Sequence, residues 1–312
     1  MKDIKFGIVV PTRNRPQNLV NLLKSIENSK LHPAALILVD FSDFHYDLPE
    51  CTFPVLFERP GIEGQVNQRN YGVNLLNKLK LVDYVLILDD DIVLEVDAIS
   101  ECISTATYYV KQDLRFVGFS LNIVNLKSSN DLFRKMLLYP KKPGLVRITT
   151  FNSSLCDLSQ DTECDWVVGG AALWSIDFLN RHPNNYPFSG KAYGEDLFYC
   201  SQVHNVARFA ASSKAKCSHI DSYSTSQINN SFYVRYNEGV SDTNLRLYLA
   251  RSFYMYSLPL TIFHILWSGF LGIVYGFMKL SAQHIALALG RIAGILKQSL
   301  NSSKYEKKGK VL

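Results

Sequence analysis

Residues 84–91 of this 312-residue chain read Tyr-Val-Leu-Ile-Leu-Asp-Asp-Asp, and this stretch decides the fold. Its apolar start predicts a buried strand, because strands covered on both faces show continuous apolar runs. Three carboxylates follow at the carboxyl end of that strand, where open α/β sheets bind their ligands. Adjacent negative charges repel one another, so they favour a hard divalent cation that carries phosphate oxygens. The ordinary alternative is that aspartates end strands and cap helices.

Other stretches predict further strands and helices around this one. The expected strands are residues 5–10, 36–39, 54–57, 84–88, 116–121, 166–174 and 207–219. The expected helices follow Pro16 and cover residues 73–79, 96–111 and 195–203. Residues 61–72 and 183–194 are rich in polar residues and glycine and are expected as loops. Because strands and helices alternate, the sequence predicts an α/β fold with a mainly parallel sheet flanked by helices.

The composition is that of a globular protein with a basic end. Hydrophobic residues make up 47% and charged residues 20%, which excludes a disordered chain. The formal net charge of +5 is modest, but lysines crowd the C-terminal end at Lys297, Lys304, Lys307, Lys308 and Lys310. Such an end suits nucleic acid or an anionic membrane surface. Because an apolar region precedes it, we expect a membrane surface as partner and no nucleic acid.

The C-terminal region differs in composition from the rest. We divide the chain into a catalytic domain, residues 1–225, and a helical membrane-associating region, residues 226–312. Residues 257–278 lack Asp, Glu, Lys and Arg and approach the length of a membrane span, although Pro, Ser and Gly dilute their hydrophobicity. Residues 282–296 carry Arg291 and resemble an interfacial helix. The alternative is a buried helical pair packed on the catalytic core.

The six cysteines form no metal or disulfide pattern. They occupy positions 51, 102, 156, 164, 200 and 217, with no Cys-x-x-Cys pair and no zinc-like spacing. The apolar run near the start, residues 6–10, is too short for the core of a signal peptide. We therefore expect a reduced protein that works at the cytoplasmic face of the cell membrane.

A second acidic site, Glu195 and Asp196, lies at the expected start of a helix. The helix dipole favours acidic residues there, so a capping role is the ordinary alternative. A functional interpretation requires this pair and the aspartate triplet of residues 89–91 to meet at one edge of the sheet. The triplet would then hold a metal diphosphate, and the pair would take a proton from an attacking hydroxyl.

Two common classes of nucleotide-binding enzyme are excluded by motif. No Gly-x-Gly-x-x-Gly follows the first expected strand, and no Walker-type Gly-x4-Gly-Lys-Ser/Thr occurs in the chain. The glycine spacing of residues 61–72 fits neither pattern. A dehydrogenase of the dinucleotide-binding type and a P-loop enzyme are therefore not expected.

Five segments of the chain resemble the motifs of glycosyltransferase family 2. They are residues 9–15 (VVPTRNR), residues 39–42 (VDFS), Gly64 with residues 69–72 (RNYG), residues 89–91 (DDD) and residues 195–196 (ED). The third is similar to the family's Arg-Asn-x-Gly segment, the fourth to its Asp-x-Asp motif and the fifth to its Glu-Asp motif. Their order and spacing are those of the family, over about residues 5–220.

The resemblance implies a GT-A fold, a nucleotide-sugar donor, Mg²⁺ or Mn²⁺ as cofactor, and usually inversion at the anomeric carbon. Carried over by position, the donor-binding residues would be Pro11, Thr12, Arg13, Asp40, Arg69, Asp89 and Asp90. Thr12, Arg13 and Asp40 would line the nucleoside pocket. Arg69 would approach the nucleotide, where a planar positive fork suits phosphate or carbonyl oxygens, and Asp89 would face the ribose or the donor sugar.

The same positions suggest a metal site. Asp91 would hold the metal, together with Asp89. The triplet leaves the ligand open between Asp90 and Asp91, because their roles exchange if the strand register shifts by one residue. His219 follows the strand after the Glu-Asp helix, and it is either a third metal contact or an ordinary loop or core histidine.

Catalytic roles are implied for the second acidic pair. Asp196 would be the base, and Glu195 would position the acceptor or a loop. The expected wall of the sugar and acceptor site consists of Trp166, Gly169, Gly170 and Trp174. Trp faces stack well on sugars, yet Trp residues in strands are more often part of the core.

These features predict an inverting glycosyltransferase, and the apolar C-terminal region makes a lipid-linked saccharide the expected acceptor. Residues 232–236, Phe-Tyr-Val-Arg-Tyr, are similar to a stretch in rhamnosyl- and galactofuranosyltransferases of bacterial surface polysaccharide assembly. Two alternatives stay open: a nucleotidyltransferase on a related sheet, and a non-catalytic membrane-associated scaffold. The sugar, the nucleotide and the linkage are not specified by the sequence.

Overall fold

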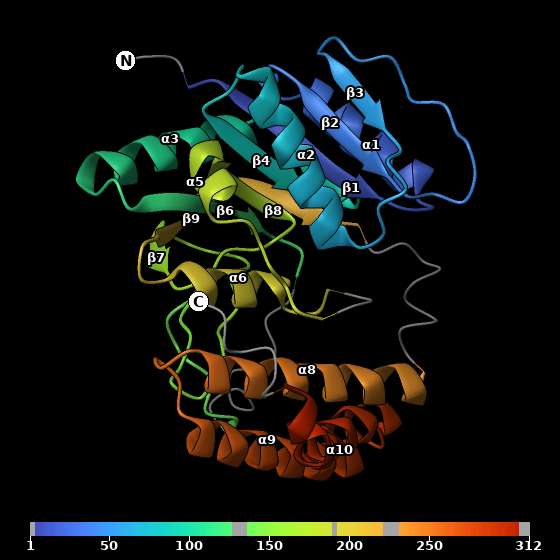
Figure 1. Ribbon diagram of the computed structural model, residues 1–312, viewed down its shortest axis with the longest axis vertical. Coiled ribbons are helices and arrows are strands. Elements are labelled where there is room, and N and C mark those ends of the chain that lie inside the picture. Colours follow the sequence, from blue (N-terminus) through green and yellow to red (C-terminus); the bar gives the residue numbers. More distant parts are fainter. Residues whose placement is uncertain (1–3, 127–135, 189–191, 221–230, 306–312) are drawn as a thin grey trace. The chain divides into compact units, whose positions relative to one another are not determined.

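The computed structural model describes residues 4–126, 136–188, 192–220 and 231–305, with side chains up to residue 297. The chain forms two compact units, whose elements are labelled in Figure 1. Unit 1 comprises Met1–Ser128, Lys142–Leu145 and Ser154–Ser222, and unit 2 comprises Ser129–Lys141, Val146–Ser153 and Tyr223–Leu312. The boundary predicted after residue 225 lies close to this division, but unit 2 also takes in two segments from the middle of the chain. The lysines after residue 305 lie outside the described residues.

The N-terminal half of the sheet in unit 1 is parallel. Its strands are β1 (Phe6–Thr12), β2 (Leu36–Asp40), β3 (Val55–Glu58) and β4 (Tyr84–Leu88), in the order β3-β2-β1-β4. Every residue of β1 and β2 is buried, in agreement with their continuous apolar sequences. The register pairs Thr12 with Asp40 at the strand ends. The carboxyl ends of β1, β2 and β4 therefore meet at one edge.

The other half of the sheet is mixed. Its strands are β5 (Ile92–Leu94), β6 (Phe116–Ile123), β7 (Thr162–Cys164), β8 (Ala171–Ser175) and β9 (Arg208–His219). β8 is antiparallel to both β4 and β6, β9 is parallel to β6, and β5 and β7 are antiparallel to β9. Side-chain periodicity predicts strands but not the direction of their neighbours. The parallel arrangement that we expected thus holds throughout the N-terminal half, whereas in the other half only β6 and β9 are parallel to each other.

Three local predictions differ from the structure. The strand expected over residues 166–174 begins only at Ala171, and the short strand β5 was not expected. Helix α2 (Gln65–Leu79) begins inside the loop expected over residues 61–72. It begins early because Gly64 adopts a φ of 94°, which glycine reaches without strain, and so turns the chain into the helix. Arg69 consequently lies on a helix.

Helices cover both faces of the sheet, as Figure 1 shows. α1 (Pro16–Glu27) and α3 (Ala98–Gln112) pack on one face, whereas α2, α5 (Ile176–Arg181) and α6 (Glu195–Val203) pack on the other. Alternate residues of a strand divide between the two cores: Ile8 and Val10 belong to the first and Val9 to the second. With both faces buried, polar groups of the sheet gather at its edge.

Among the described residues, unit 2 is built on three long helices: α8 (Phe232–Ser252), α9 (Leu258–Met278) and α10 (Ala282–Tyr305). α8 and α10 approach so closely that a Cβ on Gly239 would lie 2.2 Å from the carbonyl oxygen of Leu287. The buried carboxylate of Asp242 on α8 pairs with Arg246 at 2.8 Å and with Arg291 of α10 at 3.0 Å. Close backbone contact and charge pairing thus join these two helices.

Candidate active site

The aspartate triplet lies where β4 ends, next to the end of β1. The hydroxyl of Thr12 at the end of β1 donates a hydrogen bond of 2.7 Å to Asp90 Oδ2. The backbone N–H of Asp89 donates to the carbonyl of Gly170, just before β8, at 2.8 Å. The antiparallel strand β8 therefore brings the Gly169-Gly170 pair, expected as part of a sugar wall, against the triplet.

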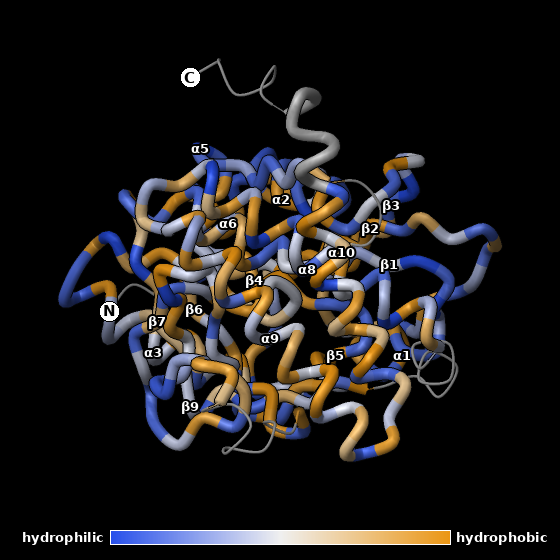
Figure 2. Tube along the Cα trace, turned by 90° about the horizontal axis from the view of Figure 1, so that it is seen from below, coloured by the Kyte–Doolittle hydropathy of each residue, from blue (hydrophilic) through white to orange (hydrophobic). Residues whose placement is uncertain are grey.

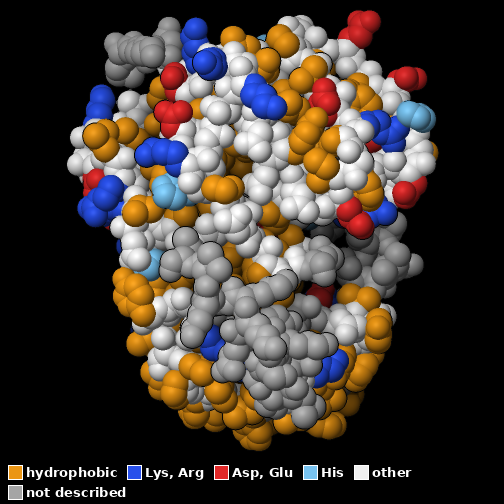
Figure 3. Space-filling model, viewed as in Figure 1, with side chains coloured by type: hydrophobic (Ala, Val, Ile, Leu, Met, Phe, Trp, Pro, Cys, Tyr) orange, Lys and Arg blue, Asp and Glu red, His pale blue; other side chains and the backbone are white. Residues whose placement is uncertain are grey.

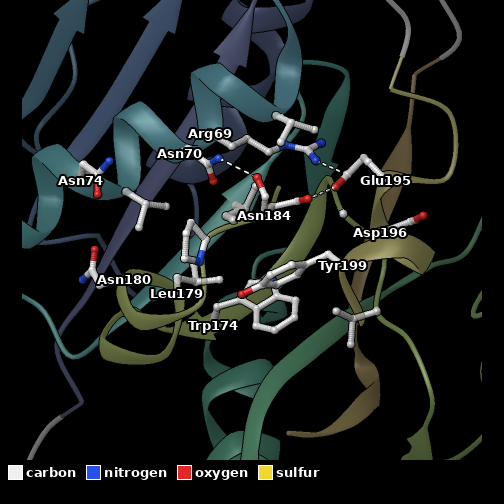
Figure 4. Close-up of a pocket in the computed structure, with 16 residues that line it drawn as sticks. Arg69, Asn70, Asn74, Trp174, Leu179, Asn180, Asn184, Glu195, Asp196 and Tyr199 are labelled. Carbon is white, nitrogen blue, oxygen red and sulfur yellow. Dashed lines mark hydrogen bonds and ion pairs between the residues drawn. The ribbon is translucent and has the colours of Figure 1, made fainter. Parts of the chain in front are cut away.

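Arg69 of α2 joins the two acidic motifs. Its Nη2 lies 2.6 Å from Asp89 Oδ1, and its Nη1 contacts Glu195 Oε1. The Arg69 side chain is 7% exposed, so the charges interact away from bulk water. Figure 4 shows the guanidinium of Arg69 pointing at Glu195. The two carboxylates thus lie within reach of one guanidinium, as the functional interpretation of the acidic pair requires.

The glycine pair before β8 makes room for these carboxylates. A Cβ on Gly169 would lie 2.0 Å from Glu195 Oε1, and a Cβ on Gly170 would lie 2.1 Å from Asp89 Oδ2. Real Cβ atoms do not approach oxygens so closely, so any other residue would displace the carboxylate. The pair therefore has a steric role that the sequence pattern did not reveal.

Glu195 is also held by the loop before α6. Asn184 Nδ2 donates to Glu195 Oε2 at 2.9 Å, and Asn70 Nδ2 of α2 donates to the carbonyl of Asn184 at 3.0 Å. In Figure 4 Glu195 points toward Arg69 and Asn184, whereas Asp196 points away from them. Asn70 and Asn184 were not predicted as site residues: Asn70 belongs to the Arg-Asn-x-Gly segment but was given no role, and Asn184 belongs to no motif.

Asp196 lies in the first turn of α6, where it is partly buried and lines a pocket. Burial raises the pKa of Asp196 to about 7, and the neighbouring charge of Glu195 acts in the same direction. The backbone N–H of Leu197 donates to Asp196 Oδ1 at 2.7 Å, which favours the charged form. A carboxyl group whose pKa lies near neutrality is suited to proton transfer.

Arg15 is a site residue that the motif contained but to which the sequence assigned no role. Its Nη1 lies 3.2 Å from Asp90 Oδ1 and 2.9 Å from Asp91 Oδ2. Burial raises the pKa of Asp90 to about 6, although the hydrogen bond from Thr12 and the charge of Arg15 oppose this shift. Burial likewise raises the pKa of Asp91, against the charge of His219. For both aspartates the effect of burial on the pKa thus outweighs that of the neighbouring Arg15.

His219 lies beside Asp91 because of strand pairing. β5 pairs with the end of β9, with Ile92 opposite His219, and the N–H of Ile220 donates to the carbonyl of Asp91 at 2.7 Å. His219 Nε2 consequently lies 3.3 Å from Asp91 Oδ1. The expected proximity of these two residues is present in the structure.

Asp91 and His219 present donor atoms that suit a divalent ion. Among the described residues, no three His, Cys, Asp or Glu side chains form a complete metal cluster. Asp91 Oδ1 is buried and accepts no hydrogen bond from the described residues, and His219 supplies a nitrogen beside it. A carboxylate and an imidazole suit Mn²⁺, which accepts both donor types, and phosphate oxygens and water commonly complete such a shell. The two residues therefore fit an ion that is shared with a diphosphate.

The ends of β1 and β2 carry the residues predicted to line the nucleoside pocket. Asp40 is buried, and its Oδ1 accepts hydrogen bonds from the N–H of Ser42 at 3.0 Å and from its hydroxyl at 2.5 Å. Arg59 Nε lies 3.0 Å from Asp40 Oδ2. The half-exposed guanidinium of Arg13 lies 4.9 Å from the centre of the Phe41 ring. Pro11 of β1 lies opposite Val39 of β2 in the sheet, one residue before Thr12.

A pocket with a volume of about 180 Å³ is lined by Arg69 and Glu195 and by further residues of α2, α5 and α6. Gly169 and Trp174 line it, together with Asp196 and Tyr199 (Figure 4). Trp174 is 3% exposed, and its ring packs 5.2 Å from that of Tyr199. Of the expected sugar wall, Trp174 is thus mainly a core residue, and Trp166 is partly buried against the same core.

Comparisons with known proteins concern the fold. No protein-family model matches the chain, and no curated protein matches its sequence. The solved structure of the mannosyltransferase PcManGT from Pyrobaculum calidifontis, in complex with GDP-Man and Mn²⁺, matches with a TM-score of 0.52 at 12% identity, over 95% of this chain and 87% of that chain. Residues 1–349 of TarS from S. aureus match with a TM-score of 0.46 at 13% identity, over 92% of this chain and 90% of that chain. The likeness to PcManGT shows that the chain has a GT-A-type glycosyltransferase fold, as the sequence motifs predicted.

Proposed function

We propose that the chain transfers a sugar from a nucleotide-sugar donor to a hydroxyl group of a saccharide, with inversion at the anomeric carbon. The observation that carries this proposal is the convergence of Asp89 and Glu195 on the guanidinium of Arg69. This contact supports a single site at the edge of a GT-A-type sheet. The GDP-Man bound by PcManGT is consistent with a donor of the same chemical class.

The proposed chemistry is a single displacement. Asp196 accepts the proton of the acceptor hydroxyl, whose oxygen then bonds to the anomeric carbon. The bond between that carbon and the diphosphate oxygen breaks on the opposite side, and a nucleoside diphosphate leaves. Arg69 and Asn184 hold Glu195 beside the base, where it positions the acceptor.

Mg²⁺ or Mn²⁺, held by Asp91 and His219, would offset the negative charge that builds on the departing diphosphate. Thr12 and Arg15 hold Asp90 and Asp91 in place at the strand end. Asp90 would thus be a buried support for the site, and Asp91 the ligand. This assignment chooses between the two roles that the sequence left open.

The proposed acceptor is a lipid-linked saccharide at the cytoplasmic face of the membrane. Among the described residues, α9 is long and apolar enough to cross a membrane by length and composition. An acceptor carried by a lipid would require the enzyme to work at a membrane surface. Unit 2, which contains this helix, supports that location.

The test of the proposed base is Asp196→Asn. With full-length protein and a panel of nucleotide sugars, release of nucleoside diphosphate should require Mn²⁺ and should fall at least about 1,000-fold in the variant. Binding of the donor, measured by calorimetry, should be retained. The matched control is Asp177→Asn, which changes an exposed carboxylate in the first turn of α5 and should leave turnover unchanged.

The pH dependence gives a second readout of Asp196. The base must be deprotonated, and its pKa is raised to about 7, so kcat/KM should increase as the pH rises through about 7. Full turnover by Asp196→Asn would remove this residue from the role of base. Release of free pyrophosphate would identify a nucleotidyltransferase, and a failure to bind any nucleotide sugar would favour the scaffold.

A further inference from the structure

Helix α9 in unit 2 exposes an apolar stripe. Its members follow one another at intervals of three or four residues, so they share one face of the helix: Leu260, Phe263, Trp267, Phe270, Val274 and Phe277. Phe263 and Phe270 are 57% and 56% exposed. From residue 258 to residue 278, every exposed side chain of α9 is apolar. Figure 3 shows hydrophobic side chains gathered on the surface of unit 2.

The buried face of α9 is the polar one. Thr261, His264 and Ser268 are all buried, and so are Gly269 and Gly276 in the second half of the helix. His264 Nδ1 lies 2.8 Å from the hydroxyl of Thr149, and its Nε2 lies 2.5 Å from the carbonyl oxygen of Leu137. A helix at the surface of a water-soluble protein has the opposite arrangement, with its polar residues outward. Figure 2 shows apolar positions predominating along α9, with paler residues between them.

This reversed pattern indicates that the apolar stripe contacts something other than water. Large contiguous apolar patches are rare on soluble monomers and mark sites of contact with lipid or protein. A basic residue, Lys279, is exposed directly after α9, and Lys297 is exposed on α10. These two positive charges favour anionic lipid headgroups beside the apolar stripe.

Packing within unit 2 argues against a membrane-spanning α9. The ring of Phe151 stacks on that of His264 with centroids 3.7 Å apart. The guanidinium of Arg246 lies 3.9 Å from the centre of the same Phe151 ring. Arg246 in turn pairs with the buried Asp242. If α9 crossed a bilayer, these charged groups, one side chain away from its inner face, would enter the hydrocarbon at a high cost.

We propose that α9 lies in the plane of the membrane interface, with the apolar stripe among the lipid acyl chains and the buried polar face on unit 2. This rests on the membrane location in the proposed function and specifies the surface and the depth of contact. Such helices immerse one face by about 5–10 Å. Trp267 sits at the middle of α9, and its indole N–H donates to the carbonyl of Met136 at 2.8 Å, so its ring reports the depth of the helix.

The first experiment measures binding to vesicles of phosphatidylcholine and phosphatidylglycerol by flotation. Full-length protein should float, and Phe263→Ser combined with Phe270→Ser should weaken partition about 30-fold, from the apolar area removed from lipid. The matched control is Tyr108→Ser combined with Leu114→Ser, which removes exposed apolar side chains from unit 1. It should float like the unchanged protein. Equal flotation of both double variants would overturn the proposal.

The second experiment measures depth. Vesicles with lipids brominated near the headgroup end should quench the fluorescence of Trp267 more than those brominated near the methyl end, after subtraction of the signal from Trp267→Phe. Stronger quenching by deep bromine would mean a spanning helix and would overturn the in-plane arrangement. A stripe-dependent dimer in sedimentation equilibrium, with no flotation, would assign the surface to a second copy instead.

Failure of this inference is separable from failure of the proposed function. Mn²⁺-dependent donor binding by the stripe variant, measured by calorimetry without vesicles, should match that of the unchanged protein. A protein that floats but binds no donor would refute the transferase and leave the membrane surface standing. A protein that binds donor but does not float would refute the membrane surface and leave the transferase standing.

Discussion

At the scale of single residues, the site depends on the shape of one guanidinium. Arg69 is almost completely buried, and its two arms reach Asp89 and Glu195. A planar fork presents fixed donors to two carboxylates at once, whereas the ammonium of lysine is a flexible point charge. Keeping the positive charge is therefore not enough to keep the geometry that holds Glu195 next to Asp196.

Arg69→Lys should lower kcat/KM about 100-fold, because a shift of about 1 Å in a catalytic group costs that much. The measurement is steady-state release of nucleoside diphosphate. Arg115→Lys is the matched control, since Arg115 is exposed and its fork also meets a carboxylate, that of Asp113. Solvent-exposed ion pairs contribute little to the stability of the fold, so the control variant should keep full activity. Equal activity of the two variants would show that the bridge is only structural.

At the scale of elements, strand pairing creates the metal-binding pair. β5 is only three residues long, and its antiparallel pairing with β9 sets Ile92 opposite His219. Asp91, directly before β5, therefore lies beside His219, although the two residues are 128 positions apart in the sequence. A change of one residue in this register would turn His219 to the other face of the sheet.

His219→Ala should weaken binding of Mn²⁺ about 10- to 100-fold, a loss of the size seen when groups around a bound metal are removed. Calorimetric titration of Mn²⁺ in the presence of a nucleoside diphosphate would measure it. His32→Ala, an exposed histidine of unit 1, serves as the control and should bind Mn²⁺ normally. If His219→Ala binds Mn²⁺ with unchanged affinity, His219 is not a metal ligand but an ordinary loop or core histidine.

At the scale of the whole molecule, the chain is two compact units with separate cores. Unit 1 carries the carboxylates and the proposed donor site, and unit 2 carries the apolar stripe. Unit 2 has its own charged centre, in which Asp242 is 1% exposed and faces Arg246 and Arg291. Removing one partner of a buried ion pair leaves the other charge uncompensated in the interior.

Asp242→Asn should therefore lower the free energy of unfolding of unit 2 by about 3 kcal/mol or more. Scanning calorimetry should show the transition of unit 2 at lower temperature, while donor binding by unit 1 below that temperature stays unchanged. Asp97→Asn removes a half-exposed carboxylate that pairs with Lys30 and should shift neither transition. A parallel loss of donor binding would mean that the two units do not respond independently.

The sequence alone determined the buried strands, the candidate acidic residues and the GT-A-type fold. Continuous apolar runs such as residues 84–88 avoid water only when both faces of the strand are buried. The local sequence therefore predicts a strand in the interior of a sheet. Sequence motifs likewise located Arg69, the aspartate triplet and the Glu-Asp pair. The site roles carried over from the resemblance stay predictions that the experiments above test.

Only the tertiary structure decided which side chains meet. The antiparallel entry of β8 brings Gly169 and Gly170 against Glu195 and Asp89, and no local periodicity records the direction of a neighbouring strand. Arg15, Asn70 and Asn184 acquire partners through contacts between remote segments, which depend on how the elements pack. The same reason holds for α9: its composition left a membrane span and a buried helix open, because burial of one face depends on its neighbours in unit 2.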